Sequence, residues 1–96
     1  MIVPVMSLGG QGVISVLSNL YPAETNAMAM AAYSGDFETA ASLQIEFSKL
    51  TQALFSEVNP IPVKAAMRLL GYDCGNCRMP LTPAAAETIT CLQEAL

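Results

Sequence analysis

The chain has 96 residues, of which 53% are hydrophobic and only 12% are charged. It is therefore one domain at most, with far fewer charged residues than the roughly 25% of an ordinary soluble domain. Four basic residues against eight acidic ones give a net charge of −4, which excludes a basic patch for nucleic acid or for an acidic lipid surface. The apolar excess predicts that part of the surface faces another chain or another part of the same protein. An unusually apolar compact domain is the alternative.

The first residues and the cysteines bear on the compartment. Residues 1–8 are apolar but lack the cationic stretch of a secretory signal peptide, and no apolar run approaches the about 20 residues of a membrane helix. The three cysteines form an odd set, which argues against a disulfide framework. We therefore expect a chain without a membrane partner, in a reducing cytoplasm.

The first two predicted elements are a short helix and a strand. Residues 2–8, IVPVMSL, combine β-branched side chains with Pro4, which suits the first turn of a helix and is incompatible with a central strand. Gly9, Gly10 and Gly12 are expected to serve a tight turn that follows. Residues 12–17, GVISVL, predict a strand without polar alternation, as in sheets buried on both faces. Such a strand needs neighbours for its hydrogen bonds, and the rest of the chain offers almost none.

A helix is predicted over about residues 20–34, which are rich in alanine and methionine. Ser18 or Asn19 is expected to cap its start, with Pro22 in its first turn. Gly35 fits the position just past its end, where a positive φ is needed.

The longest predicted helix covers about residues 37–55, with Asp36 as its cap. Its apolar residues follow a 3-4-3-4 spacing that predicts one stripe packed against another helix. The stripe consists of Ala40, Leu43, Phe47, Leu50 and Leu54.

Two more helices are predicted after it. In NPIPVKAAMRLLG, Asn59 is the expected cap and Gly71 the end. In LTPAAAETITCLQEAL, Thr82 is the expected cap and Pro83 the first helical residue. The outline is one strand among helices, which is not a complete α/β fold.

The strings LGGQGVISV, EVNPIPVKAAM and RMPLTP occur in this order. Together they resemble the C-terminal portion of the dihydrodipicolinate synthase family, whose members are pyruvate-dependent Schiff-base lyases and aldolases. The similarity runs from about Pro4 to Leu96, and the NPIPVK string is its most specific piece.

The resemblance implies a mainly α chain that is a C-terminal fragment of a (β/α)8 barrel with an appended helical bundle. Residues 1–35 would be the last βα unit, with residues 12–17 as the eighth barrel strand, and residues 36–96 a three-helix extension. In the family this strand pairs with the seventh and the first. The implied partner is therefore a complementary N-terminal barrel fragment, or further copies of the chain in a dimer or tetramer.

The resemblance also implies the condensation of pyruvate with aspartate semialdehyde in lysine biosynthesis, through a lysine Schiff base and without a cofactor. The family's Schiff-base lysine and its proton relay lie upstream of the matching region. Lys49 and Lys64 lie on predicted helices instead, so no catalytic residue is expected here and the chain alone is predicted to be inactive. One site residue matches: Ile14, whose main-chain carbonyl would lie beside the bound pyruvate of the intact enzyme.

Other readings stay open. The chain could be a self-associating helical module without enzymatic activity. Cys74 and Cys77 form a CxxC pair, on which a small metal or thiol protein could be built. Zinc would need Cys91 and a carboxylate as further ligands, and a redox pair usually opens a helix in a βαβ unit, which is absent here. We expect ordinary loop cysteines and no metal. Glu57 is expected to be part of a capped helix start, and Lys64 a solvated or snorkelling helix cation.

Overall fold

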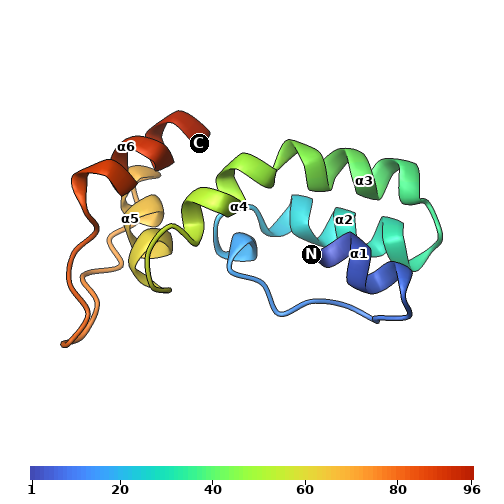
Figure 1. Cartoon of the computed structure of the whole chain (residues 1–96), viewed down its shortest axis with the longest axis horizontal. Coiled ribbons are helices and arrows are strands. Elements are labelled where there is room, and N and C mark those ends of the chain that lie inside the picture. Colours follow the sequence, from blue (N-terminus) through green and yellow to red (C-terminus); the bar gives the residue numbers. More distant parts are fainter. The chain divides into compact units, whose positions relative to one another are not determined.

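The computed structural model describes all 96 residues and contains helices but no strand (Figure 1). The mainly α class is therefore confirmed. The elements are α1 (Ile2–Ser7), a 3-10 turn η1 (Leu17–Asn19), α2 (Pro22–Tyr33), α3 (Phe37–Glu46), α4 (Ser48–Leu54), α5 (Ile61–Leu69) and α6 (Ala86–Ala95). The chain forms two compact units, Met1–Ser48 and Lys49–Leu96.

In the first unit α2 packs against both α1 and α3. The core cluster consists of Val3, Met6, Met28, Ala32 and Ala40, with Met28 and Ala40 completely enclosed. The start of α1 is tied to α3, because the Val3 N–H donates to Gln44 Oε1 at 3.1 Å. This bond satisfies one of the N–H groups that every helix start leaves without a partner.

The predicted cap of α3 is confirmed. Asp36 Oδ1 accepts from the Thr39 N–H at 3.2 Å, and Gly35 precedes it at φ +87°. The Thr39 hydroxyl, followed by the Thr39 N–H, lowers the pKa of the Asp36 carboxyl. This carboxylate therefore holds the turn between α2 and α3.

The strand predicted over residues 12–17 is wrong for this structure. Residues 11–15 have no regular secondary structure, and Leu17 already belongs to η1. A strand forms only where another strand takes its backbone hydrogen bonds, and the chain contains no other strand. The β-branched run is thus present without the sheet that it requires.

The single helix predicted over residues 37–55 is also wrong. It is interrupted at Phe47, where α3 ends and α4 follows. The Ser48 hydroxyl donates to the Ile45 carbonyl at 2.8 Å, and such a local bond competes with the main-chain ladder and bends helices. Of the predicted stripe, Ala40, Leu50 and Leu54 are buried, whereas Leu43 and Phe47 are half-buried.

The second unit contains α5 and α6 packed on each other. Its fully buried side chains include Leu54, Pro62 and Leu92. The unit also holds all four basic residues of the chain, whereas the first unit carries four acidic residues and no basic one. The acidic excess thus belongs to residues 1–48.

Three predicted helix caps are wrong. Ser18 and Asn19 lie in η1, and α2 begins after Tyr21 with Pro22 as its first residue. Pro60 rather than Asn59 precedes α5. Thr82 does not cap α6, which begins only at Ala86. Helices α2, α5 and α6 have no side-chain cap on the residue that precedes them, so a local capping signal could not locate their starts.

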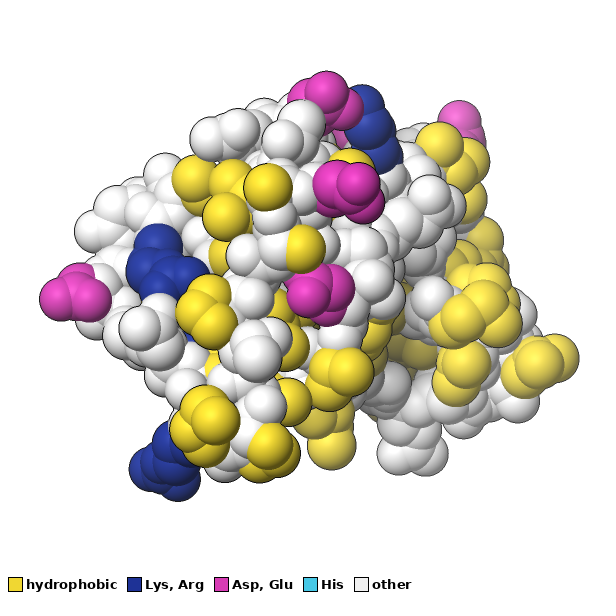
Figure 2. Space-filling model, turned by 60° about the vertical axis from the view of Figure 1, so that its left-hand side comes forward, with side chains coloured by type: hydrophobic (Ala, Val, Ile, Leu, Met, Phe, Trp, Pro, Cys, Tyr) yellow, Lys and Arg dark blue, Asp and Glu magenta, His cyan; other side chains and the backbone are white.

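Hydrophobic side chains are exposed in both units (Figure 2). Leu8 is 90% exposed in the first unit and Met79 is 85% exposed in the second. These exposed side chains agree with the prediction from the sequence that the chain has more apolar surface than it can bury. None of the helices has the length and apolar character needed to cross a bilayer.

The two methionines on α2 allow a matched test of the first core. Met28→Ala should destabilise the chain by about 2–5 kcal/mol, because it leaves a cavity in an enclosed cluster. Met30→Ala, on the same helix but 54% exposed, should change stability by less than about 0.5 kcal/mol. Urea unfolding followed by circular dichroism measures both; equal losses would contradict the core described here.

Candidate functional site

The segment of Gln11, Gly12, Val13 and Ile14 has unpaired backbone groups. None of their N–H or C=O groups forms a hydrogen bond within the chain. The Ile14 side chain is fully exposed, at 106% of its reference area. An isoleucine in this state is unusual, since isoleucine is among the residues most often buried. This segment is therefore the candidate functional site.

A glycine turn fixes the segment at its start. Gly9 has φ +101°, a conformation that side chains with a Cβ rarely adopt. The Gly10 N–H donates to the Val5 carbonyl at 3.1 Å, and a Cβ on Gly10 would lie 2.8 Å from Val5 Cγ1. The prediction that these two glycines serve the turn is confirmed, whereas Gly12 has open space around it.

A pair of serines fixes the segment at its end. The Ser18 N–H donates to Ser15 Oγ at 3.1 Å, and Ser18 Oγ donates to the Ser15 carbonyl at 2.7 Å. The Asn19 side chain adds a bond to the Val16 carbonyl at 3.0 Å. The free backbone of residues 11–14 thus runs between two hydrogen-bonded ends.

A hollow of about 340 Å³ lies between this segment and α2. Gln11, Gly12 and Val13 line one side, and Thr25, Asn26 and Met30 line part of the other. The Thr25 hydroxyl is already used, because it donates to the Tyr21 carbonyl at 2.8 Å. No carboxylate, lysine or arginine lines this hollow, so by itself it offers no acid, base or charged anchor.

Neither lysine is enclosed as a Schiff-base lysine must be, where desolvation keeps the amine neutral. Lys64 on α5 is half-buried, and its ammonium donates to the carbonyls of Cys74 at 3.4 Å and Asn76 at 3.2 Å. It holds a loop from a half-buried position, which agrees with the snorkelling form of the predicted helix cation and not with the solvated form.

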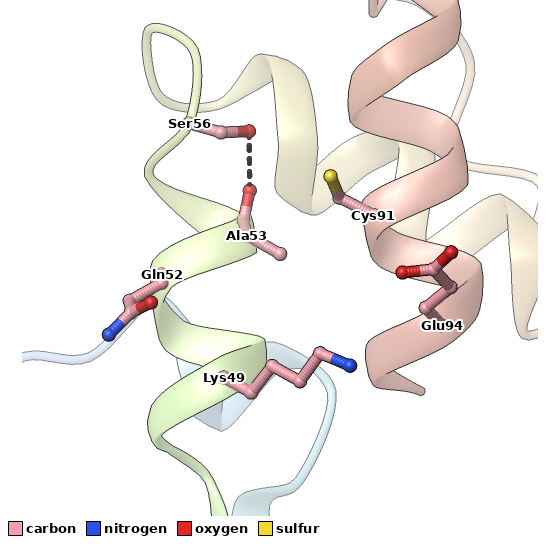
Figure 3. A pocket seen from close by; sticks show the side chains of 6 residues that line it. All are labelled: Lys49, Gln52, Ala53, Ser56, Cys91 and Glu94. Carbon is pink, nitrogen blue, oxygen red and sulfur yellow. Dashed lines mark hydrogen bonds between the residues drawn. The ribbon is translucent and has the colours of Figure 1, made fainter.

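Lys49 is exposed on α4. It lines a second hollow of about 270 Å³, in which its side chain extends toward α6, where Cys91 and Glu94 lie (Figure 3). Lys49 is open to water, and the Glu94 side chain lines the same hollow. This hollow therefore does not provide the dry surroundings of an imine-forming lysine.

The three tyrosines are not gathered at the segment. Tyr21 is half-buried and packs on Phe47, with ring centroids 5.1 Å apart. Tyr33 and Tyr72 are 68% and 60% exposed.

Glu57 performs the capping that Thr82 was expected to provide. Its Oε2 accepts from the Ala85 N–H at 3.0 Å, across 28 positions of sequence. The Thr88 hydroxyl, followed by the Ala85 N–H, lowers the pKa of the Glu57 carboxyl. Thr88 itself is buried. The prediction of a structural role is confirmed, although the helix start that Glu57 caps is that of α6.

The CxxC pair lies in the irregular loop between α5 and α6. Cys74, Cys77 and Cys91 are all free thiols, and Cys74 Sγ donates to the Lys64 carbonyl at 3.4 Å. No three cysteine, aspartate or glutamate side chains lie close enough together to hold a metal ion.

The comparisons with known proteins agree with the residues that suggested a resemblance. The model of the dihydrodipicolinate synthetase family matches residues 1–96. The chain belongs to this family.

Individual relatives of the family give the extent of the match. The 4-hydroxy-tetrahydrodipicolinate synthase of Thermoanaerobacter sp. (strain X514) is 45% identical over 95 residues, which are 99% of this chain and 32% of that protein. The crystal structure of dihydrodipicolinate synthase from Thermotoga maritima is 38% identical with a TM-score of 0.93, over 97% of this chain and 32% of that one. The chloride-inhibited enzyme from Acinetobacter baumannii, complexed with pyruvate, is 35% identical with a TM-score of 0.91, over 97% and 32%. This chain therefore spans about a third of the length of these family members.

Two contacts of this family member lay outside sequence reasoning. Glu57 and Ala85 are 28 positions apart, and the loop bonds of Lys64 reach 10 and 12 positions. No spacing rule for helices joins such positions. The only available signal was their position: Glu57 lies two residues before the NPIPVK string, and Lys64 is its last residue.

Acid should weaken the second unit through Glu57. Because its pKa is lowered in the folded chain, its stabilisation is present above the ordinary glutamate pKa of about 4.3 and is lost as the pH falls through the lower folded value. Glu57→Gln should therefore lower the melting temperature at pH 7 and flatten its fall in acid. Glu94→Gln is the matched control, with no such cap. If the melting temperature of Glu57→Gln fell in acid as steeply as that of the parent chain, this role would be contradicted. Asp36 retains its own contribution in both variants.

Proposed function

We propose that this chain is the C-terminal third of a 4-hydroxy-tetrahydrodipicolinate synthase. The complete enzyme would condense pyruvate with aspartate semialdehyde in lysine biosynthesis, through a lysine Schiff base and without a cofactor. The observation that carries the proposal is the free backbone of residues 11–14, which is what a barrel strand without its neighbours would present. The family match over the whole chain supports it.

Residues 12–17 would become the eighth barrel strand when the remaining two thirds of the enzyme are present. Parallel strands on both sides would take the free N–H and C=O groups, and the Ile14 side chain would enter the layered barrel interior. Residues 1–35 would then be the last βα unit and residues 36–96 the appended extension, here formed by α3, α4, α5 and α6.

The contribution of this part to the site would be the main-chain carbonyl of Ile14 beside pyruvate. A carbonyl held in a sheet is a rigid acceptor that costs little to position. The glycine turn before it and the serine pair after it support this role, since both fix the backbone without using the groups between them. A reducing cytoplasm is the proposed compartment, in keeping with three free thiols.

By itself the chain should not form the imine. We expect that borohydride reduction in the presence of pyruvate leaves its mass unchanged, because Lys49 is exposed and the Lys64 ammonium holds a loop. The intact enzyme from Thermotoga maritima, treated in parallel, should gain one reduced pyruvyl group. An adduct on Lys49 or Lys64 would overturn this part of the proposal.

Ile14→Asp separates the isolated chain from the assembled one. In the isolated chain the side chain contacts little, so the free energy of unfolding should change by less than about 0.5 kcal/mol. With a complementary barrel portion, built from the part of a relative that this chain does not cover, the buried carboxylate should prevent assembly. Ile14→Val is the matched control and should assemble like the parent in size-exclusion chromatography. Assembly of the Ile14→Asp chain would contradict the strand assignment.

A self-associating helical module is the second candidate, favoured by the exposed hydrophobic side chains of both units. Leu8, Ile45 and Met79 are each more than 70% exposed. In this case the parent chain alone would sediment as a dimer or tetramer, with or without a complementary barrel portion. A chain that remains a monomer at all concentrations tested would argue against this candidate.

A further inference from the structure

The loop between α5 and α6 holds the thiol pair in a cationic setting. Residues 72–78 have no regular secondary structure (Figure 1), yet basic side chains fasten them to α5. Lys64 donates to the carbonyls of Cys74 and Asn76, and Arg68 donates to the Gly75 carbonyl and to Asn76 Oδ1. Two basic side chains of α5 thus hold the loop.

The two thiols differ in their surroundings. Cys74 Sγ is engaged with the Lys64 carbonyl at 3.4 Å. Cys77 instead lines a cavity of about 580 Å³, together with Lys64, Arg78 and Met79. This volume lies in the range of small-molecule sites. Cys77 is therefore the thiol that a reagent entering the cavity meets first.

The charges around the cavity select the reagent. Lys64 and Arg78 line it, and no carboxylate does. Three of the chain's four basic residues, Lys64, Arg68 and Arg78, lie on this loop or contact it. In a chain with a net charge of −4, this is the place that attracts a small anion.

We propose that Cys74 and Cys77 form a redox modification site that reacts with a small acidic disulfide of the glutathione class. The Cys77 thiolate attacks one sulfur of oxidised glutathione, a Cys77–glutathione disulfide forms, and one glutathione leaves with the proton that Cys77 gave up. The Cys74 thiolate then attacks the Cys77 sulfur, and the second glutathione leaves with a proton. Two cysteines are oxidised to one disulfide while one oxidised glutathione is reduced to two glutathiones.

The second step needs the loop to form a turn. Residues 72–78 contain no turn in this structure, and a turn over the four residues of the CxxC pair would bring the Cα atoms of Cys74 and Cys77 within the separation that a disulfide requires. Gly75 already has φ +67°, a conformation that such a turn can use. Closing the disulfide removes the hydrogen bond that the Cys74 thiol donates to the Lys64 carbonyl. The modification therefore removes one of the bonds that attach the loop to α5.

The test uses the full chain with Cys91→Ser, which leaves only the two loop thiols. With oxidised glutathione, both thiols should disappear from maleimide labelling and the mass should fall by two hydrogens. In Cys74→Ser, the reaction should stop at one glutathione on Cys77. In Cys77→Ser, the adduct on Cys74 should form more slowly. Two thiols that remain labelled, or an adduct that forms faster on Cys74 than on Cys77, would overturn the proposal.

The role of charge has its own control. Arg78→Gln should slow the reaction with oxidised glutathione roughly two- to tenfold and leave the reaction with neutral hydroxyethyl disulfide unchanged. Raising the salt to about 0.15 M, where the Debye length is about 8 Å, should slow only the anionic reagent. Equal effects on both disulfides would contradict a cationic entrance.

Discussion

Four consecutive residues, from Gln11 to Ile14, leave every backbone hydrogen-bonding group without a partner in the chain. Water can satisfy these groups in isolation, but unpaired backbone groups are also a template for pairing with strands. Hydrogen bonds form on both sides of the segment, in the turn at Gly9 and Gly10 and in the Ser15–Ser18 pair, and none forms within it. The backbone groups of the segment therefore stay available, which connects the local structure to the family membership and to the proposed part in a barrel.

Helix ends and a loop in the two units are stabilised by contacts that reach far along the sequence. α1 depends on the side chain of Gln44, α6 depends on Glu57, and the loop before α6 depends on Lys64 and Arg68. These are side-chain to backbone bonds at helix ends and loops, where main-chain groups lack internal partners. Both compact units thus use polar side chains to complete what a small hydrophobic core leaves open, while large apolar side chains such as Leu8 and Met79 stay at the surface.

Sequence reasoning found the elements whose signals are local. The helix at residues 2–8, the Pro22 start of α2, the Asp36 cap and the Gly35 and Gly71 ends are each set by neighbouring residues, and each is present. It failed where the partner lies elsewhere. Residues 12–17 have strand propensity but no second strand, and Thr82 has capping chemistry but Glu57 does the capping. The break at Phe47 depends on the hydroxyl of Ser48. The sequence alone does not show whether such a hydroxyl bonds to the backbone or points to solvent. At the candidate site, the prediction of Ile14 as a site residue rested on the resemblance alone. The exposure of its side chain and its unpaired backbone groups could be seen only in the structure.

The bond between Val3 and Gln44 sets an order for synthesis of the chain. The ribosome makes α1 first, but the group that completes its first turn arrives only when α3 has been translated. Until then α1 has six residues and no side-chain cap of its own, too short to persist as an isolated helix. The other long-range cap runs in the opposite order, because Glu57 is already in place when Ala85 emerges. The two caps therefore form at different times in translation: α1 is made before Gln44, whereas α6 is made after Glu57.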